Sequence, residues 1–138
     1  MKLVVIDTNA LISFVTDRNL AQQEKVAALF EASSHLKVGI LCHQNVLTEF
    51  VFVMERVYAV PKETINAMIA DFIALPGVEI VHDLDYKVLL ALWPAPFVDF
   101  GDAILAVLCK SRKNAALVSF DERFAKSAVK IGLKIHPI

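Results

Sequence analysis

Four acidic residues in this chain stand beside strongly apolar segments, where a strand passes to a helix or just inside that helix. They are Asp7, Glu49, Asp102 and Asp121, and Asp99 is a fifth candidate. An unpaired carboxylate is costly to bury, so four of them beside buried segments imply that a positive charge holds them together. An all-oxygen ligand set favours Mg²⁺ or Mn²⁺ over Zn²⁺, which prefers nitrogen and sulfur.

Hydrolysis at phosphorus is one reaction that a site of this kind can perform. A hard divalent cation activates water, stabilises negative charge at the phosphorus and holds the substrate in line. Four carboxylates exceed the charge of one cation, so a second cation is expected to bind weakly until a phosphate arrives. The four histidines of the chain do not fall at a ligand spacing such as His-x₃-His, and we interpret them as surface or structural residues.

Each acidic residue also has a purely structural interpretation. Asp7 and Asp121 each precede a helical segment and are suited to cap it. Asp99 and Asp102 stand three apart at a helix start, which is the spacing of a capping box with Asp99 as the N-cap. Asp99 therefore stays open between ligand and cap. Glu49 could face solvent on a surface helix, although its neighbours in LTEFVF are mostly apolar.

The elements that position these residues alternate between strand and helix. Short apolar runs predict strands over residues 2–6, 38–42, 78–81, 115–119 and 133–136. Helical patterns open at Asp7-Thr8-Asn9, recur around residues 26–30, and cover 45–58, 61–75, 83–93, 99–112 and 121–131. This alternation predicts an α/β fold with a mostly parallel sheet covered on both faces. Ligands of such sheets bind outside the carboxyl ends of the strands, where the acidic residues fall.

Length and composition limit the alternatives. A chain of 138 residues is expected to form a single domain over residues 1–138. Its apolar fraction is 57%, but the longest apolar run, 88–98, contains two prolines and is too short to span a membrane. The uninterrupted apolar run before Asp7 has only four residues, Leu3 to Ile6, too few for a signal peptide. Cys42 and Cys109 lie in separate apolar segments, and buried reduced thiols in a cytoplasmic protein are expected.

Charge is unevenly distributed along the chain. The formal net charge is −1, yet the segment from Lys110 onward carries about +5 and the remainder about −6. The basic run contains Lys110, Arg112 and Lys113. It is suited either to a solvated helix end, where it would interact with the helix dipole, or to contact with phosphate groups.

The motifs together resemble a known family. Asp-Thr-Asn after the first strand, an internal Glu, Asp-Phe-Gly-Asp-Ala and finally Ser-Phe-Asp-Glu-Arg-Phe resemble the PIN domain, and in particular the ribonucleases of VapC-type toxin–antitoxin pairs. The resemblance covers essentially the whole chain in the right order. It implies a three-layer α/β/α sandwich around a parallel sheet. Ser119 stands where Thr is commoner, and His43-Gln44-Asn45 has no assigned role.

The resemblance implies a metal-dependent endoribonuclease that uses Mg²⁺ or Mn²⁺ and leaves a 5′-phosphate and a 3′-hydroxyl. Asp7, Glu49 and Asp102 would be the core ligands, and Asp121 would hold a second metal or orient water. The side chains expected to orient these carboxylates or to touch phosphate are Thr8, Asn9 and Ser119.

Several other functions fit the sequence less well. A phosphotransferase of the haloacid dehalogenase kind needs a second Asp two residues after the first, where this chain has Asn9. A receiver domain needs paired acids ahead of that site, which the N-terminus lacks. A non-catalytic RNA- or protein-binding PIN module is disfavoured because all four acids are present. An RNA-processing PIN nuclease outside a toxin–antitoxin pair remains an alternative.

Partners follow from the resemblance and the apolar surplus. A toxin ribonuclease implies an antitoxin protein, and 57% apolar residues exceed what one small core readily hides. We therefore expect an antitoxin groove and a homodimer face, with candidate stripes on the helices over 45–58 and 61–75. Ordinary core packing is the competing interpretation of those stripes.

Overall fold

The structure is a computed structural model that describes all 138 residues. Its elements in chain order are β1 (Lys2–Ile6), α1 (Thr8–Val15), α2 (Leu20–Ser34), β2 (Val38–His43), α3 (Gln44–Arg56), α4 (Lys62–Ile73), β3 (Val78–Val81), α5 (Tyr86–Leu92), α6 (Phe100–Ser111), β4 (Ala116–Val118), α7 (Glu122–Lys130) and β5 (Lys134–Ile135). The five strands form one sheet in the order β3-β2-β1-β4-β5. Every pairing is parallel, which confirms the predicted α/β class.

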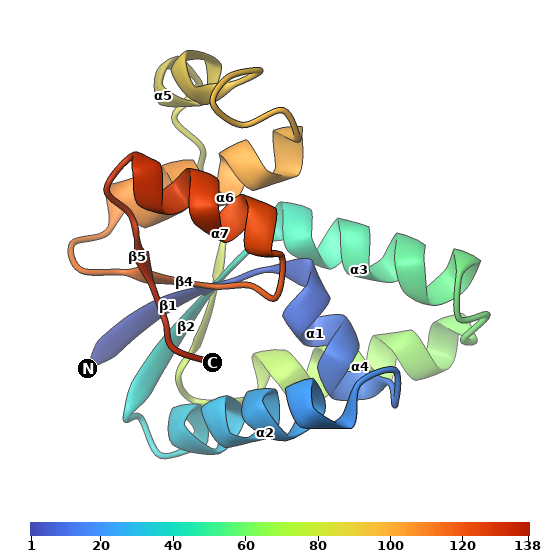
Figure 1. Cartoon of the computed structure of the whole chain (residues 1–138). Helices are drawn as coiled ribbons and strands as arrows, with labels where there is room; N and C mark the ends of the chain where they lie inside the picture. The colour runs from blue at the N-terminus through green and yellow to red at the C-terminus, as the bar shows by residue number, and fades with distance from the viewer.

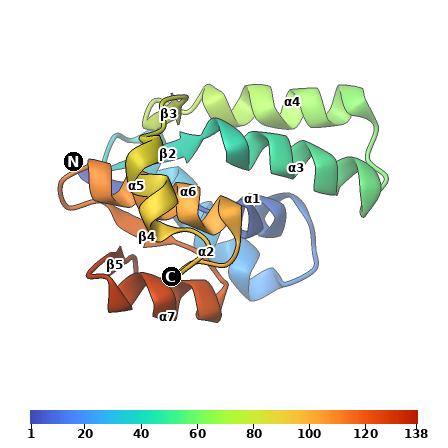
Figure 2. The same cartoon turned by 90° about the horizontal axis from the view of Figure 1, so that it is seen from above.

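The helices form layers on both faces of the sheet. Figure 1 shows α2 and α4 on one side and α6 and α7 on the other. Seen from above, α3 and α4 run side by side and project beyond the sheet (Figure 2). The three-layer α/β/α arrangement is therefore confirmed. Because β1 lies at the centre, the residues that follow its carboxyl end are surrounded by neighbouring elements.

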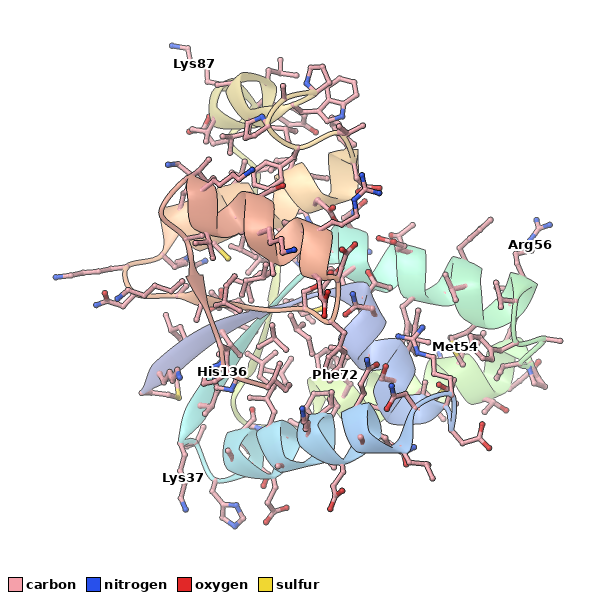
Figure 3. The ribbon with its side chains drawn as sticks, viewed as in Figure 1. Lys37, Met54, Arg56, Phe72, Lys87 and His136 are labelled. Atoms are coloured by element: carbon pink, nitrogen blue, oxygen red, sulfur yellow. The ribbon has the colours of Figure 1, made fainter.

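The core is built around β1, β4 and α6. Val4, Val5 and Ile6 of β1 are fully buried, and each residue from Ala103 to Cys109 of α6 is at most 4% exposed. A helix that is apolar all round is a buried helix, so α6 holds its acidic first turn in a fixed position. Figure 3 shows the side chains of the whole chain, in which Met54 and Phe72 are buried.

Among the helices and strands for which bounds were predicted, one boundary differs from the structure by more than two residues. The helix expected over 83–93 begins only at Tyr86, because the carboxylate of Asp85 accepts the N–H groups of Lys87 and Val88 and so caps the helix there. The strands expected over 115–119 and 133–136 are shorter, at Ala116–Val118 and Lys134–Ile135.

The cysteines are both buried and unpaired. Burial raises the pKa of the Cys42 and Cys109 thiols to about 12, so neither is a reactive thiolate at neutral pH. None of the helices has the length and apolar character that crossing a membrane requires.

Candidate active site

The five acidic residues line a single cleft at the carboxyl edge of the sheet. The cleft has a volume of about 630 Å³ and is lined by 14 residues. Its carboxylates come from four places in the chain: Asp7 after β1, Glu49 on α3, Asp99 and Asp102 at the start of α6, and Asp121 before α7. The structure thus brings together every acidic residue that the sequence singled out.

Asp7 is fixed by hydrogen bonds that join the ends of β1 and β4. The Ser119 hydroxyl donates to Asp7 Oδ2 at 2.6 Å, and the Thr8 N–H donates to Oδ1 at 2.7 Å. The Asn9 amide donates to Asp7 Oδ2 and to the Ser119 hydroxyl, at 3.3 and 3.2 Å. The Asn9 side-chain oxygen accepts the backbone N–H of Phe120 at 3.1 Å. Asp7 therefore caps α1 and holds one orientation toward the cleft.

Glu49 lies on the second turn of α3 and reaches toward α1. The Thr8 hydroxyl donates to Glu49 Oε2 at 3.1 Å, so Thr8 orients this carboxylate as predicted for its position. Thr8 itself is buried next to Asp7. One pair of adjacent residues after β1 thus contributes a carboxylate and fixes a second one.

His43, which the sequence left without a role, caps the helix that carries Glu49. His43 Nδ1 accepts the Asn45 N–H at 3.0 Å, and its Nε2 lies 3.2 Å from the Asp83 carbonyl. Nε2 must donate to that carbonyl, which fixes the neutral tautomer. Burial lowers the pKa of His43 and keeps Nδ1 free to accept.

Gly101 allows α3 to approach the start of α6. A Cβ at this position would lie 3.1 Å from Asp99 Oδ1, 3.5 Å from Asn45 Nδ2 and 3.6 Å from Glu49 Oε2. Asp99 Oδ1 accepts the Asp102 N–H at 2.9 Å, so Asp99 is the N-cap of α6. The glycine of Asp-Phe-Gly-Asp-Ala was visible in the sequence, but its close neighbours were not.

The carboxylates of the cleft repel one another. Burial, together with repulsion from the other four acidic residues of the cleft, raises the pKa of Asp102 to about 7. Burial raises the pKa of Asp7 to about 6, with smaller contributions from Glu49 and Asp121 and with opposing hydrogen bonds from Ser119 and Thr8. The pKa of Glu49 is also raised, by burial and then by Asp99. A cation in the cleft would relieve this repulsion.

Five acidic residues line the cleft and offer carboxylate oxygens as ligands. Such oxygens are the ligands that a hard divalent cation prefers. As the side chains stand, no group of three or more acidic, histidine or cysteine residues is arranged to hold a metal ion. The fit therefore rests on the donor set and on the mutual repulsion of the carboxylates. The metal-ligand roles predicted for these residues stay predictions.

The basic run predicted to contact RNA lies away from the cleft. Lys110, Arg112 and Lys113 stand at the opposite end of α6, about 15 Å along the helix axis from Asp102. Arg112 is paired with Glu79 at 3.1 Å. The cationic side chain that does line the cleft is Arg123 on α7, to which the sequence assigned no role.

Comparison with known proteins is consistent with this geometry. A family model described as the PIN domain matches residues 4–130 of the chain. No match was found among curated proteins. PIN domains are generally metal-dependent nucleases, which are hydrolases. The match covers most of the sheet and every acidic residue of the cleft, and the chain therefore belongs to the PIN domain family.

Proposed function

We propose that residues 1–138 form a single nuclease domain that cleaves RNA internally, as the VapC-type toxin of a type II toxin–antitoxin pair. The observation that carries the proposal is the convergence of five carboxylates from four segments in one cleft. The presence of all these acidic residues favours catalysis over a non-catalytic binding module. Carboxylates that repel one another lower the stability of the fold, and such groups cluster at functional sites.

Asp7, Glu49 and Asp102 would hold Mg²⁺ or Mn²⁺, and Asp99 would add a further oxygen. When bound, the cation supplies activation of water and charge stabilisation at the phosphorus. Ser119 and Asn9 hold Asp7, and Thr8 holds Glu49, so hydrogen bonds restrict the orientations of two of the three ligands.

Asp121 has one oxygen free for the reacting water. Its Oδ1 accepts the N–H groups of Arg123 and Phe124 at 3.0 and 3.1 Å, which leaves Oδ2 without a protein donor. In the proposed reaction Oδ2 of Asp121 orients the attacking water toward the phosphorus or contacts a second cation. Hydrolysis would leave a 5′-phosphate and a 3′-hydroxyl.

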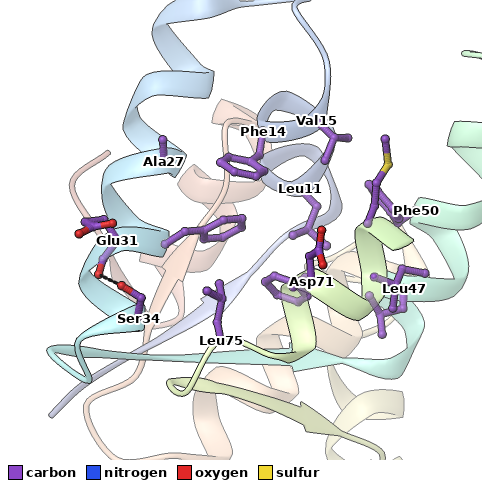
Figure 4. Close-up of a pocket in the computed structure, with 14 residues that line it drawn as sticks. Leu11, Phe14, Val15, Ala27, Glu31, Ser34, Leu47, Phe50, Asp71 and Leu75 are labelled. Carbon is purple, nitrogen blue, oxygen red and sulfur yellow. Dashed lines mark hydrogen bonds between the residues drawn. The ribbon is translucent and has the colours of Figure 1, made fainter. Parts of the chain in front are cut away.

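An apolar pocket supports an antitoxin partner. It has a volume of about 460 Å³ and lies among α1, α2, α3 and α4, where 11 of its 14 lining residues are hydrophobic. Figure 4 shows Leu11, Phe14, Leu47 and Phe50 among the side chains that line it. The partner proposed for this pocket is the apolar segment of an antitoxin. Both chains would act in the cytoplasm, where thiols such as those of this protein stay reduced.

A homodimer is the second proposed assembly. Phe52, Val57 and Ile73 are large apolar residues on or next to α3 and α4, and they are 61%, 68% and 49% exposed. Helices that present such residues to solvent are suited to pack against a second copy. These residues lie outside the pocket proposed for the antitoxin.

The decisive test is cleavage of total RNA by the purified protein. We expect internal cuts with Mg²⁺ or Mn²⁺, no cuts with EDTA, and 5′-phosphate ends that allow direct ligation of an adaptor. Cleavage that persists in EDTA would overturn the metal-dependent mechanism. Neutralisation of the activity by the product of a neighbouring small gene would separate a toxin from an RNA-processing nuclease of the same fold.

A further inference from the structure

Arg123 is the one cationic side chain among the 14 residues that line the acidic cleft. It stands in the first turn of α7, directly after the Asp121 cap and Glu122. Its position is well fixed, because the next residue, Phe124, is 2% exposed and packs edge-on against Phe97 at 5.7 Å. The stem of Arg123 thus starts from an anchored turn, although its side chain is exposed.

The guanidinium of Arg123 has no partner within the protein. The ion pairs of the structure join His35 to Glu31, Lys62 to Glu55, and Arg112 to Glu79. Arg123 forms none, although it shares a cleft with five carboxylates. An arginine whose role was to neutralise those carboxylates would lie within ion-pair distance of at least one. Its free guanidinium therefore remains available to an anion that enters the cleft.

The segment next to α7 contributes an apolar wall to the same cleft. Pro96, Phe97 and Val98 line it, and Val98 is 83% exposed. The Trp93 indole N–H donates to the Val98 carbonyl at 2.9 Å, which holds this segment in place. The Phe97–Phe124 contact joins the segment to α7. The positive charge of Arg123 suits the phosphate of a nucleotide, and the apolar wall beside it suits the base.

We infer that Arg123 binds a backbone phosphate of the RNA, adjacent to the phosphate that is hydrolysed. The inference rests on the proposed function. The planar guanidinium donates two parallel N–H···O bonds to phosphate oxygens, a geometry that lysine cannot reproduce. Since the contact is made to a phosphate that does not react, it contributes equally to the bound substrate and to the transition state. Such a residue lowers KM and leaves kcat unchanged.

The test is the steady-state kinetics of Arg123→Gln on a single-stranded oligoribonucleotide with Mg²⁺. We expect KM to rise about tenfold with kcat unchanged. We also expect the dependence of log KM on log salt concentration to become shallower by about 0.7, the value for one lost phosphate contact on a single strand. Arg123→Lys should restore the salt dependence but only part of the affinity.

Lys126→Gln is the matched control, because Lys126 is an exposed cation on the same helix that does not line the cleft. An equal change in KM in Lys126→Gln and Arg123→Gln would overturn the inference. It would show that Arg123 contributes only to the overall electrostatic potential and makes no specific phosphate contact. Wild-type KM in Arg123→Gln would overturn the inference and leave the proposed function intact. A wild-type protein that neither binds nor cleaves the oligoribonucleotide would overturn both.

Discussion

Asp7 combines a helix cap and a buried carboxylate in one side chain. It is only 9% exposed, its Oδ1 caps α1, and its Oδ2 accepts the Ser119 hydroxyl. A helix cap alone would not require a carboxylate in this place, because a serine or asparagine caps equally well. The negative charge is what costs free energy here, and burial raises the pKa of Asp7 to about 6 as a result. A charge kept at such a cost points to a cationic ligand.

We predict that Asp7→Asn abolishes RNA cleavage and leaves the fold intact. Asparagine keeps an oxygen for the cap of α1, but it removes the charge that binds the cation, and a loss of about a thousandfold or more in rate is expected. The matched control is Asp85→Asn, which alters a capping aspartate of α5 that lies outside the cleft. Circular dichroism should give the same spectrum for both variants. Activity of Asp7→Asn close to that of Asp85→Asn would refute the ligand assignment.

The raised pKa values of Asp7 and Asp102 predict that the metal-free protein loses stability as the pH rises. Between the ordinary pKa of an aspartate, 3.8, and the folded values of about 6 and 7, the folded state binds more protons than the unfolded state. The free energy of unfolding therefore falls over this range, and the full cost of the charged cleft is present above pH 7.

Thermal unfolding in EDTA measures this effect. We expect the Tm of the wild type to fall from pH 5 to pH 8, and we expect Asp102→Asn to flatten that dependence. Mg²⁺ should raise the Tm more at pH 8 than at pH 5, because the carboxylates must be deprotonated to bind it. A wild-type Tm in EDTA that rises between pH 5 and pH 8 in parallel with that of Asp102→Asn would contradict the prediction.

The elements explain why these side chains meet. Three helices begin at the cleft with an acidic N-cap: α1 at Asp7, α6 at Asp99 and α7 at Asp121. Helix α3 brings Glu49 to the same place because His43 starts it directly after β2. The buried helix α6 then fixes the depth of the cleft, since its small first-turn residue Gly101 leaves room for α3.

We predict that Gly101→Ala lowers activity without lowering the stability of the protein by a comparable amount. Alanine favours a helix over glycine by about 1 kcal/mol, so the helix itself gains. The added Cβ, however, meets Asp99 Oδ1 at 3.1 Å, so this carboxylate must shift by a few tenths of an ångström, whereas 3.6 Å to Glu49 Oε2 is an ordinary contact. Mg²⁺ titration of the Tm, compared with the Tm in EDTA, separates the two effects. An unchanged Mg²⁺ response would show that the close approach is not needed.

Much of this arrangement could be predicted from the sequence. The strands β1 and β3 have the predicted bounds because charged or turn residues delimit short apolar runs, and the acidic residues fall at the predicted edge. The predicted start of α5 was wrong because periodicity alone does not reveal which aspartate caps the helix. The position of Arg123 in the cleft was missed because the sequence does not reveal in which direction a charged side chain in an exposed first turn points. RNA contact by the basic run after Lys110 stays a prediction, because this run is separated from the cleft by the length of α6.

At the scale of the whole molecule, the acidic cleft and the apolar pocket have separate linings with no residue in common. The cleft is formed by α1, α3, α6 and α7 together with the segment around Pro96–Val98. The apolar pocket is formed by α1 to α4, where Phe30 packs against Phe14 and Phe72 at ring distances of 4.5 and 5.4 Å. Helices α1 and α3 contribute to both, so a partner in the pocket would contact the same helices that carry Thr8 and Glu49.

We predict that the protein is a dimer at micromolar concentration and that Phe52→Glu makes it a monomer. Phe52 is 61% exposed on α3, so the charged side chain disturbs no core and acts only on an interface. Light scattering coupled to size exclusion gives the mass of each form. The matched control is Leu90→Glu on α5, which is 60% exposed and should leave the dimer unchanged. A monomeric wild type would count against the proposed dimer face.

The three acidic caps have a further consequence, for how firmly the cleft retains its cation. The first turns of α1, α6 and α7 place the positive ends of three helix dipoles at the acidic cleft. These dipoles partly cancel the attraction of the carboxylates, so the ion is expected to exchange readily with its surroundings. The rate of the proposed hydrolysis would then depend on the concentration of the free cation.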